Sequence, residues 1–230
     1  MNGALAANNI TQIKGLIKKS KILDDRKKDK YTKELNQLHK RYSDISIDDK
    51  YSSQYKQMNK KGVDVIKELG ISKDKKSLEG SIEVYTRYLK ASIGDFEGKT
   101  SNVRKYITSF VFTSMLFLAL TPQFYGFMLP MLFFIPIYIG LKGVKDRSMN
   151  GFYMTMSVVP VALMTGVTWV RYGFSVIQDY DKALSQIVNS GINESLAKIL
   201  VIGEPILGGL LVVFALTQLY RGIKNKDLFI

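Results

Sequence analysis

The sequence contains no cysteine and a single histidine, His39. Without cysteine the chain has no disulfide framework and no thiolate nucleophile. Zinc sites are commonly built from histidine and cysteine, and this chain lacks such a ligand set. A Ser-His-Asp triad has only His39 to draw on, and a lone histidine in a lysine-rich helical stretch is explained by solvation. No metal site and no cofactor are therefore expected.

Charge is scarce in the second half of the chain. Of the 53 charged residues, 38 lie in residues 1–105 and only 11 in residues 106–220. This distribution implies two different solvents, water and lipid. We therefore expect a cytoplasmic Lys-rich helical domain over residues 1–105 and a four-helix transmembrane domain over residues 106–230 that ends in a short tail. The expected fold class is all-α: an integral membrane protein with four transmembrane helices preceded by a cytoplasmic helical hairpin or bundle.

Three long apolar stretches define the expected spans. Residues 106–141 carry no charge but are interrupted by Thr-Pro-Gln at 121–123, and one span needs about 20 apolar residues. We therefore expect this stretch to cross the membrane twice as two short helices. The alternative is a re-entrant hairpin that never crosses, which lipid tolerates only where protein covers the irregular backbone. Residues 148–170 and 199–220 supply two further spans, the second with one charge, Glu204.

Lysines and arginines close to the spans predict the orientation of the chain. By the positive-inside rule, cationic flanking segments lie in the cytoplasm. With four spans both termini share one side, which carries Arg104, Lys105, Lys142, Lys145, Arg147, Arg221, Lys224 and Lys226. We therefore expect a multi-pass membrane protein with both termini in the cytoplasm. Aromatic residues near the span ends, including Trp169 and Tyr172, agree with this placement of the interfaces.

Apolar residues in the N-terminal region recur at helical spacing. Residues 31–42, 55–69 and 78–96 each carry an apolar stripe with steps of three and four residues, which predicts three helices. Polar connections are expected at residues 43–53 and 71–76. The apolar faces are narrow, so we expect this region to need a partner, a second copy or the membrane to complete its core.

The first 23 residues contain four lysines and no acid, with Ile10, Ile13, Leu16 and Ile17 at helical spacing. Two interpretations are open: an amphipathic helix on the anionic inner leaflet, or the first helix of the N-terminal domain with its lysines in water. The net charge of +10 over residues 1–105 makes anionic lipid headgroups expected partners. Nucleic acid is not expected, because the lysines are interspersed with acids and no recognition motif is present.

Glu204 is the one ionisable side chain inside a predicted span. A carboxylate in lipid is expensive, so it should face protein, water or an ion. Gly203, Glu204 and Pro205 together are typical of a helix start, with proline at the first helical position and the acid beside the positive end of the dipole. Residues 199–203 would then be non-helical. Several copies of Glu204 around a symmetry axis would form a carboxylate ring that selects cations.

A plainer interpretation of Glu204 is also open. Its side chain can snorkel to the headgroups, pair with Lys198 or Arg171, or be protonated and hydrogen-bonded between helices. Pro205 would then be an ordinary kink. Small residues separately predict close helix contacts in the last two spans, at Ala162, Gly166, Gly208 and Gly209.

The leading functional hypothesis is a homo-oligomeric membrane channel or transport component, with Glu204 near the outer mouth of a cation path. A homo-oligomer or a subunit of a larger membrane complex is expected, because four short spans leave little room for a private water path. The alternative is a membrane-anchored interaction or regulatory protein whose N-terminal helices recruit a partner. An intramembrane enzyme is disfavoured, because the spans offer one Glu and no His, Cys or Asp for acid–base chemistry.

Overall fold

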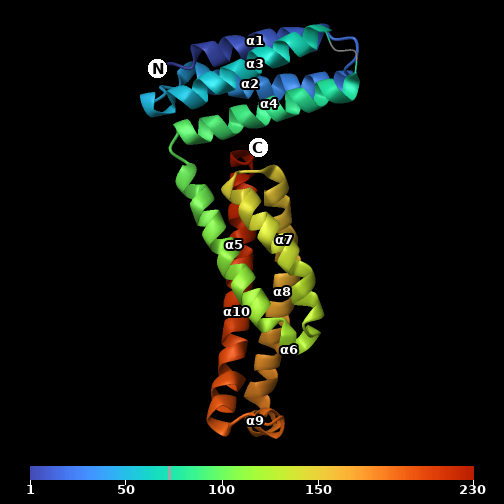
Figure 1. The fold of residues 1–230 in the computed structure, drawn as a ribbon, viewed down its shortest axis with the longest axis vertical. Helices are drawn as coiled ribbons and strands as arrows, with labels where there is room; N and C mark the ends of the chain where they lie inside the picture. Colours follow the sequence, from blue (N-terminus) through green and yellow to red (C-terminus); the bar gives the residue numbers. More distant parts are fainter. Residues whose placement is uncertain (72–73) are drawn as a thin grey trace. The chain divides into compact units, whose positions relative to one another are not determined.

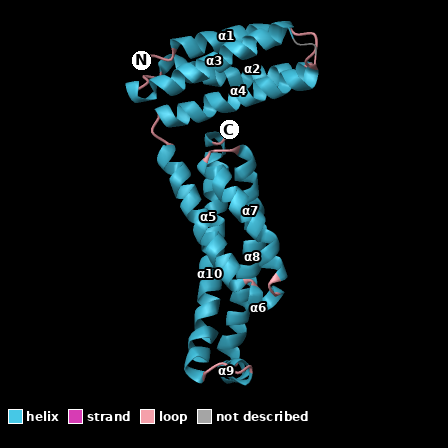
Figure 2. Cartoon of the chain, viewed as in Figure 1, coloured by secondary structure: helices cyan, strands magenta, loops and turns pink. Residues whose placement is uncertain are grey.

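The computed structural model describes residues 1–71 and 74–230, which form helices and contain no strand (Figure 2). Two compact units make up the chain. The first is Met1–Ser101 together with Asp227–Ile230, and the second is Asn102–Lys226. The sequence-based boundary at residue 105 therefore lies a few residues inside the second unit.

The last four residues belong to the first unit, whereas the sequence-based division grouped them with the spans. Leu228 is buried against Gly94, where any added side chain would have to displace the end of the leucine. Asp227 also forms an ion pair with Lys90 at 3.6 Å. These contacts explain why the tail belongs to the first unit, and the distribution of charge along the sequence could not predict them.

The described residues of the first unit form a bundle of four helices (Figure 1). These are α1 (Ala4–Lys19), α2 (Asp25–Asp44), α3 (Ser52–Ile71) and α4 (Lys75–Phe96), with a 3-10 turn, η1 (Asp49–Tyr51), before α3. The three predicted stripes are confirmed as the core-facing sides of α2, α3 and α4. The connection expected at residues 71–76 includes residues 72 and 73, which lie outside the described residues.

Helix α1 supplies the fourth side of the bundle core. Ile10, Ile13 and Ile17 are each fully buried and belong to one core cluster with residues from α2, α3 and α4. Burying each such side chain contributes about 1.5–3 kcal/mol. The interpretation of this segment as a helix lying on the leaflet is therefore wrong, because its apolar face is inside the bundle. The expectation that the region needs a partner to complete its core is wrong for the same reason.

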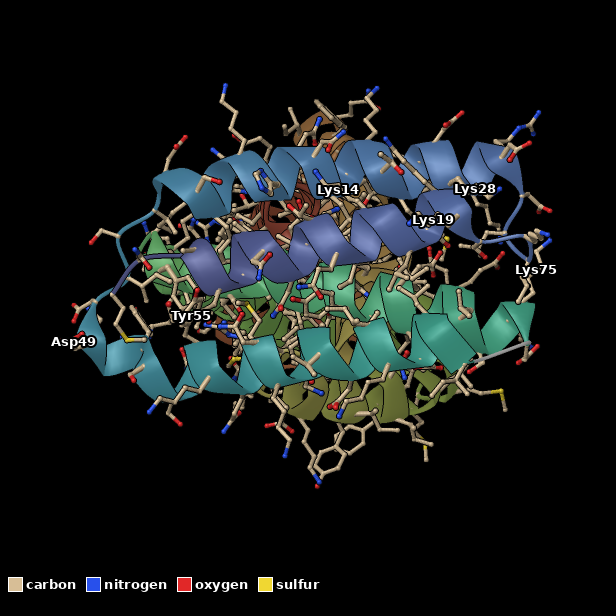
Figure 3. All side chains as sticks on the ribbon, turned by 90° about the horizontal axis from the view of Figure 1, so that it is seen from above. Lys14, Lys19, Lys28, Asp49, Tyr55 and Lys75 are labelled. Atoms are coloured by element: carbon tan, nitrogen blue, oxygen red, sulfur yellow. The ribbon has the colours of Figure 1, made fainter. Side chains whose placement is uncertain are left out.

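The surface of the bundle carries charges of both signs. Lys19, Lys28 and Lys75 lie at one end and Asp49 at the other (Figure 3). Lys75 donates to Asp24 at 2.7 Å, and this hydrogen bond lowers the pKa of the Asp24 carboxyl. Both side chains are exposed to water, so the pair fixes geometry more than it stabilises the fold.

The second unit contains six helices among its described residues. They are α5 (Thr100–Leu120), which begins at the unit boundary, α6 (Pro122–Tyr125), α7 (Met128–Lys145), α8 (Met149–Gln178), α9 (Tyr180–Asn189) and α10 (Glu194–Asn225). Four of these, α5, α7, α8 and α10, are long and apolar enough to cross a membrane. The expected break at residues 121–123 is confirmed as the short α6, with proline at its first turn.

The surface of the second unit is apolar. Met128 is 84% exposed and Ile223 68%, and many other large apolar side chains on α5, α7, α8 and α10 also face outward. In water an apolar surface of this extent would drive aggregation, whereas in hydrocarbon it is the expected lining of a membrane-spanning unit. The surface composition thus agrees with the length and apolarity of the four helices.

Helix α8 packs against both α7 and α10 through glycines. A Cβ on Gly143 of α7 would lie 2.5 Å from the Cα of Gly151 on α8, so the two backbones touch. On the other side of α8, a Cβ on Gly166 would lie 2.9 Å from the carbonyl oxygen of Gly208 on α10. Close approach through small residues is how helices associate when lipid removes the hydrophobic difference between inside and outside.

Candidate functional site

Glu204 lies within an unbroken helix. Helix α10 begins at Glu194, where the side chain of Asn193 accepts a hydrogen bond from the backbone N–H of Ser195 at 2.9 Å and caps the first turn. The expected helix start at Gly203, Glu204 and Pro205 is therefore wrong, as is the non-helical lead-in before it. Pro205 sits inside the helix, where its missing N–H costs one backbone hydrogen bond but does not end the helix.

The carboxylate of Glu204 is half-buried and contacts α6. Gln123 Nε2 donates to Glu204 Oε1 at 3.4 Å. With the Gln123 amide turned over, its nitrogen instead donates to the carbonyl oxygens of Leu120 at 2.8 Å and Ala119 at 3.2 Å, and its oxygen faces Glu204. Lys198, one of the expected partners of Glu204, pairs with Glu194 at 2.7 Å. In the first orientation the Gln123 amide donates to the carboxylate, and in the second its oxygen can only accept a proton from a protonated Glu204, so Gln123 is the neighbour of Glu204 on α6 in both.

Helix α6, where the chain turns back between α5 and α7, lies beside the middle of α8 and α10 and not beside their ends. Trp169 Nε1 donates to the Leu120 carbonyl at 2.9 Å, and the hydroxyls of Tyr125 and Thr168 lie 3.0 Å apart, so α5 ends level with Trp169. Helix α8 continues nine residues beyond Trp169, which is about 13 Å of helix. Glu204 is ten residues into α10, about 15 Å from its start. Figure 1 shows α8 and α10 continuing past α6 to α9.

The segments beyond α6 form an extension made of residues 171–178 of α8, α9, and residues 194–203 of α10. Its two long helices expose large apolar side chains: Ile177 on α8 is 81% exposed and Ile199 on α10 is 67% exposed. A groove of about 300 Å³ runs between its two long helices, where Gly173 packs against Pro205. The chain between the two long helices forms the short helix α9.

Aromatic rings gather where α6 meets α8. The ring of Phe124 lies 4.6 Å from that of Trp169 and 6.3 Å from that of Tyr172, and Trp169 and Tyr172 are 5.6 Å apart, all measured between centroids. Pro205, the residue after Glu204, packs against Gly173, the residue after Tyr172. We call Gln123, Phe124, Trp169, Tyr172 and Glu204 the α6 site.

A second polar cluster lies near the opposite ends of the spans. The hydroxyls of Tyr106 and Thr155 are 2.6 Å apart, and Gln218 Nε2 donates to the Thr155 carbonyl at 2.9 Å. All three side chains are buried, so they tie α5, α8 and α10 together. Sequence reasoning missed Gln218. Gln218 could have been found as a polar residue within an apolar span, because an amide in that position needs hydrogen-bonding partners on neighbouring helices.

The predicted helix-contact residues lie on two different faces. Ala162 is fully buried, and Gly166 and Gly208 face each other across α8 and α10. Gly209 points into open space, with nothing within 4 Å of where its Cβ would be. Gly203 is open in the same way. The α8–α10 contact thus uses Gly166 and Gly208 but not Gly209.

Among the described residues, no three His, Cys, Asp or Glu side chains converge as a metal site would require. No protein-family model, curated protein or solved structure matches the chain. The fold and the site together define an all-helical protein with four helices able to cross a membrane and one carboxylate held beside the turn between the first two.

Proposed function

We propose that this protein is a homo-oligomeric membrane channel or transport component in which Glu204 attracts cations near the outer mouth. The supporting observation is the position of Glu204 beside α6, about 15 Å along α10 from its start, with apolar exposed residues on either side of that level. A carboxylate at that depth in hydrocarbon is costly unless water or a cation reaches it. A hydrated approach from the α9 end meets this requirement.

The proposed placement puts α9 at the outer headgroups and the cationic loop between α7 and α8 in the cytoplasm. Helix α9 has an apolar side, where Ala183 packs against Val176 and Val201, and a charged side with Asp181 and Lys182, as an interfacial helix does. The hairpin of α5, α6 and α7 then stops about 13 Å short of the outer surface. In this proposal the hairpin reaches deeper than a re-entrant loop but does not cross the whole bilayer. Both termini are cytoplasmic whether or not the hairpin crosses.

The cation path in this proposal forms between copies of the chain. The interface of α5, α8 and α10 is filled by buried side chains such as Phe110, Phe117 and Leu211. Such packing leaves no continuous water path inside one chain at this interface. Symmetric association would bring several copies of Glu204 around one axis, where their negative potential selects cations.

Neutralising Glu204 tests the transport proposal. Glu204→Gln keeps the shape of the side chain but removes its charge. We expect cation flux into liposomes to fall by about tenfold or more, because losing a few kcal/mol of attraction for a cation lowers its occupancy by at least that factor. The matched control is Glu194→Gln on the same helix, whose carboxylate already pairs with Lys198. We expect this control to retain flux. Equal flux for wild type and Glu204→Gln would contradict the proposal.

A second candidate function is supported by the first unit. Helices α1 to α4 close their own core, so this unit needs no membrane to fold, and it presents a lysine-rich surface. A membrane-anchored module that recruits an acidic partner would have this form. We expect removal of residues 1–101 to abolish capture of such a partner in crosslinking mass spectrometry of membranes, while Glu204→Gln retains it. Identical crosslinked partners with and without residues 1–101 would exclude recruitment by this unit.

A further inference from the structure

We propose that the α6 site binds an organic ammonium cation, with the charge of the ligand facing Glu204 and its carbon substituents against the rings of Phe124 and Tyr172. This inference rests on the proposed transport function, because it names the chemical class of cation that would be taken up at Glu204. Aromatic rings attract cations through their negative faces, and they attract alkylated ammonium groups in particular because the substituents also make apolar contacts.

The site presents aromatic surface beside the carboxylate. Phe124 is 41% exposed and Tyr172 is partly exposed, so parts of both rings are open to a ligand, whereas Trp169 is buried beneath them. The indole N–H of Trp169 is held by the Leu120 carbonyl at 2.9 Å, which fixes the orientation of its ring. The three rings lie within 4.6–6.3 Å of one another. Glu204 lies 3.4 Å from the amide of Gln123, the residue before Phe124, and Pro205, the residue after Glu204, packs against Gly173, the residue after Tyr172. The carboxylate and the aromatic rings are therefore neighbours at the level of α6.

The chemistry of the site disfavours a divalent metal cation such as calcium or magnesium. Calcium takes six to eight oxygen ligands and magnesium six, with carboxylates prominent among them, whereas the α6 site offers one carboxylate and one amide. An ammonium group needs a single counter-charge and gains from aromatic contact. Neither nearby cation competes for Glu204: Lys198 pairs with Glu194, and Arg171 forms no ion pair with Glu204 in the described structure. Glu204 is thus available to a ligand.

The experiment uses Trp169, the only tryptophan of the chain, as its reporter. The full-length protein in a maltoside detergent, which itself carries no ammonium group, is titrated with tetramethylammonium chloride while sodium chloride is lowered to hold ionic strength constant. We expect a saturable change in Trp169 fluorescence. In Glu204→Gln the apparent dissociation constant should rise about tenfold or more, because the counter-charge is gone. The control Glu194→Gln should bind as wild type does.

Two ring variants test the aromatic contribution. Phe124→Leu keeps an apolar side chain but removes the ring, and its apparent dissociation constant should rise about two- to fivefold, the ratio for one partly exposed cation–π contact. The matched control is Phe174→Leu, which removes an exposed ring outside the α6 site and should bind as wild type does. Circular dichroism and elution volume identify the folded variants, to which the comparison is restricted.

Several outcomes would overturn the inference: no saturable fluorescence change, an equal change with sodium alone, or unchanged binding in Glu204→Gln. Failure of this inference and failure of the transport proposal are distinguishable. Flux of inorganic cations that depends on Glu204 without tetramethylammonium binding overturns the ammonium site and leaves transport standing. Binding that depends on Glu204 without any flux overturns transport and leaves the ammonium site standing.

Discussion

Replacing Gly208 with leucine is expected to disrupt the second unit. A Cβ at this position would lie 2.2 Å from Cβ of Trp169, an atom fixed to its backbone that cannot swing away. The two helices must then separate, and this also breaks the approach of Gly166 to the Gly208 carbonyl. We expect a loss of about 3 kcal/mol in the free energy of unfolding, the upper end for overpacking. In thermal unfolding followed by Trp169 fluorescence, this corresponds to a decrease in Tm of roughly 6–12 °C.

The neighbouring glycine provides the matched control. Gly209 has nothing within 4 Å of where its Cβ would be, so leucine at this position meets open space, which in the membrane is lipid. Leucine also favours helix over glycine by up to about 1 kcal/mol. We therefore expect Gly209→Leu to unfold at or slightly above the wild-type temperature. Equal losses of stability in the two variants would show that α8 and α10 do not pack through Gly208.

The helices of the first unit could be predicted from the sequence because their exposed sides are charged and their buried sides are apolar. Stripes such as Tyr31, Leu35, Leu38 and Tyr42 stand out against charged neighbours, and the structure buries all four. Whether these faces closed on one another could not be predicted from each helix alone. The fourth side of the core comes from α1, through Ile10, Ile13 and Ile17. The sequence of this segment also fits a membrane-surface helix, and only its burial in the bundle decides between the two.

Contact faces in the second unit were harder to predict because lipid removes that contrast. Both faces of an apolar helix are rich in Leu, Ile, Val and Phe, so only small or polar residues indicate where helices touch. The contact of Gly143 with Gly151 involves two glycines only eight residues apart across a turn, and neither stood out in the sequence.

The α6 site was predictable only at its charged residue. Glu204 stands out as an acid in an apolar stretch, but its partner Gln123 is 81 residues away and lies in what the sequence shows only as a helix break. The rings of Phe124 and Tyr172 come together because α6 turns back at the level of Trp169. That level depends on how far α5 extends along α8, which local sequence does not encode. The start of α10 was mispredicted because Pro205 outweighed the weaker capping signal of Asn193.

Replacing Leu35 with alanine is expected to destabilise the first unit selectively. Leu35 is fully buried in the core formed by α1, α2, α3 and α4. Deleting its branched end leaves a cavity, which costs about 2–5 kcal/mol in the free energy of unfolding. In hydrogen–deuterium exchange of the full chain, the most protected amides of α1 to α4 should exchange roughly 30-fold faster or more, because their opening requires unfolding of the bundle.

Leu5→Ala is the matched control, because it removes the same side-chain atoms from an exposed position, where no cavity forms. Leu5 lies on α1 and is 63% exposed, so Leu5→Ala should change stability by less than about 0.5 kcal/mol and leave exchange nearly unchanged. Amides of α8 and α10 should keep their protection in both variants, because the core around Leu35 contains no residue of the second unit. If Leu35→Ala accelerated exchange equally in α8 and α10, the two units would unfold as one cooperative body. A recruitment module that folds independently of its anchor would then be excluded.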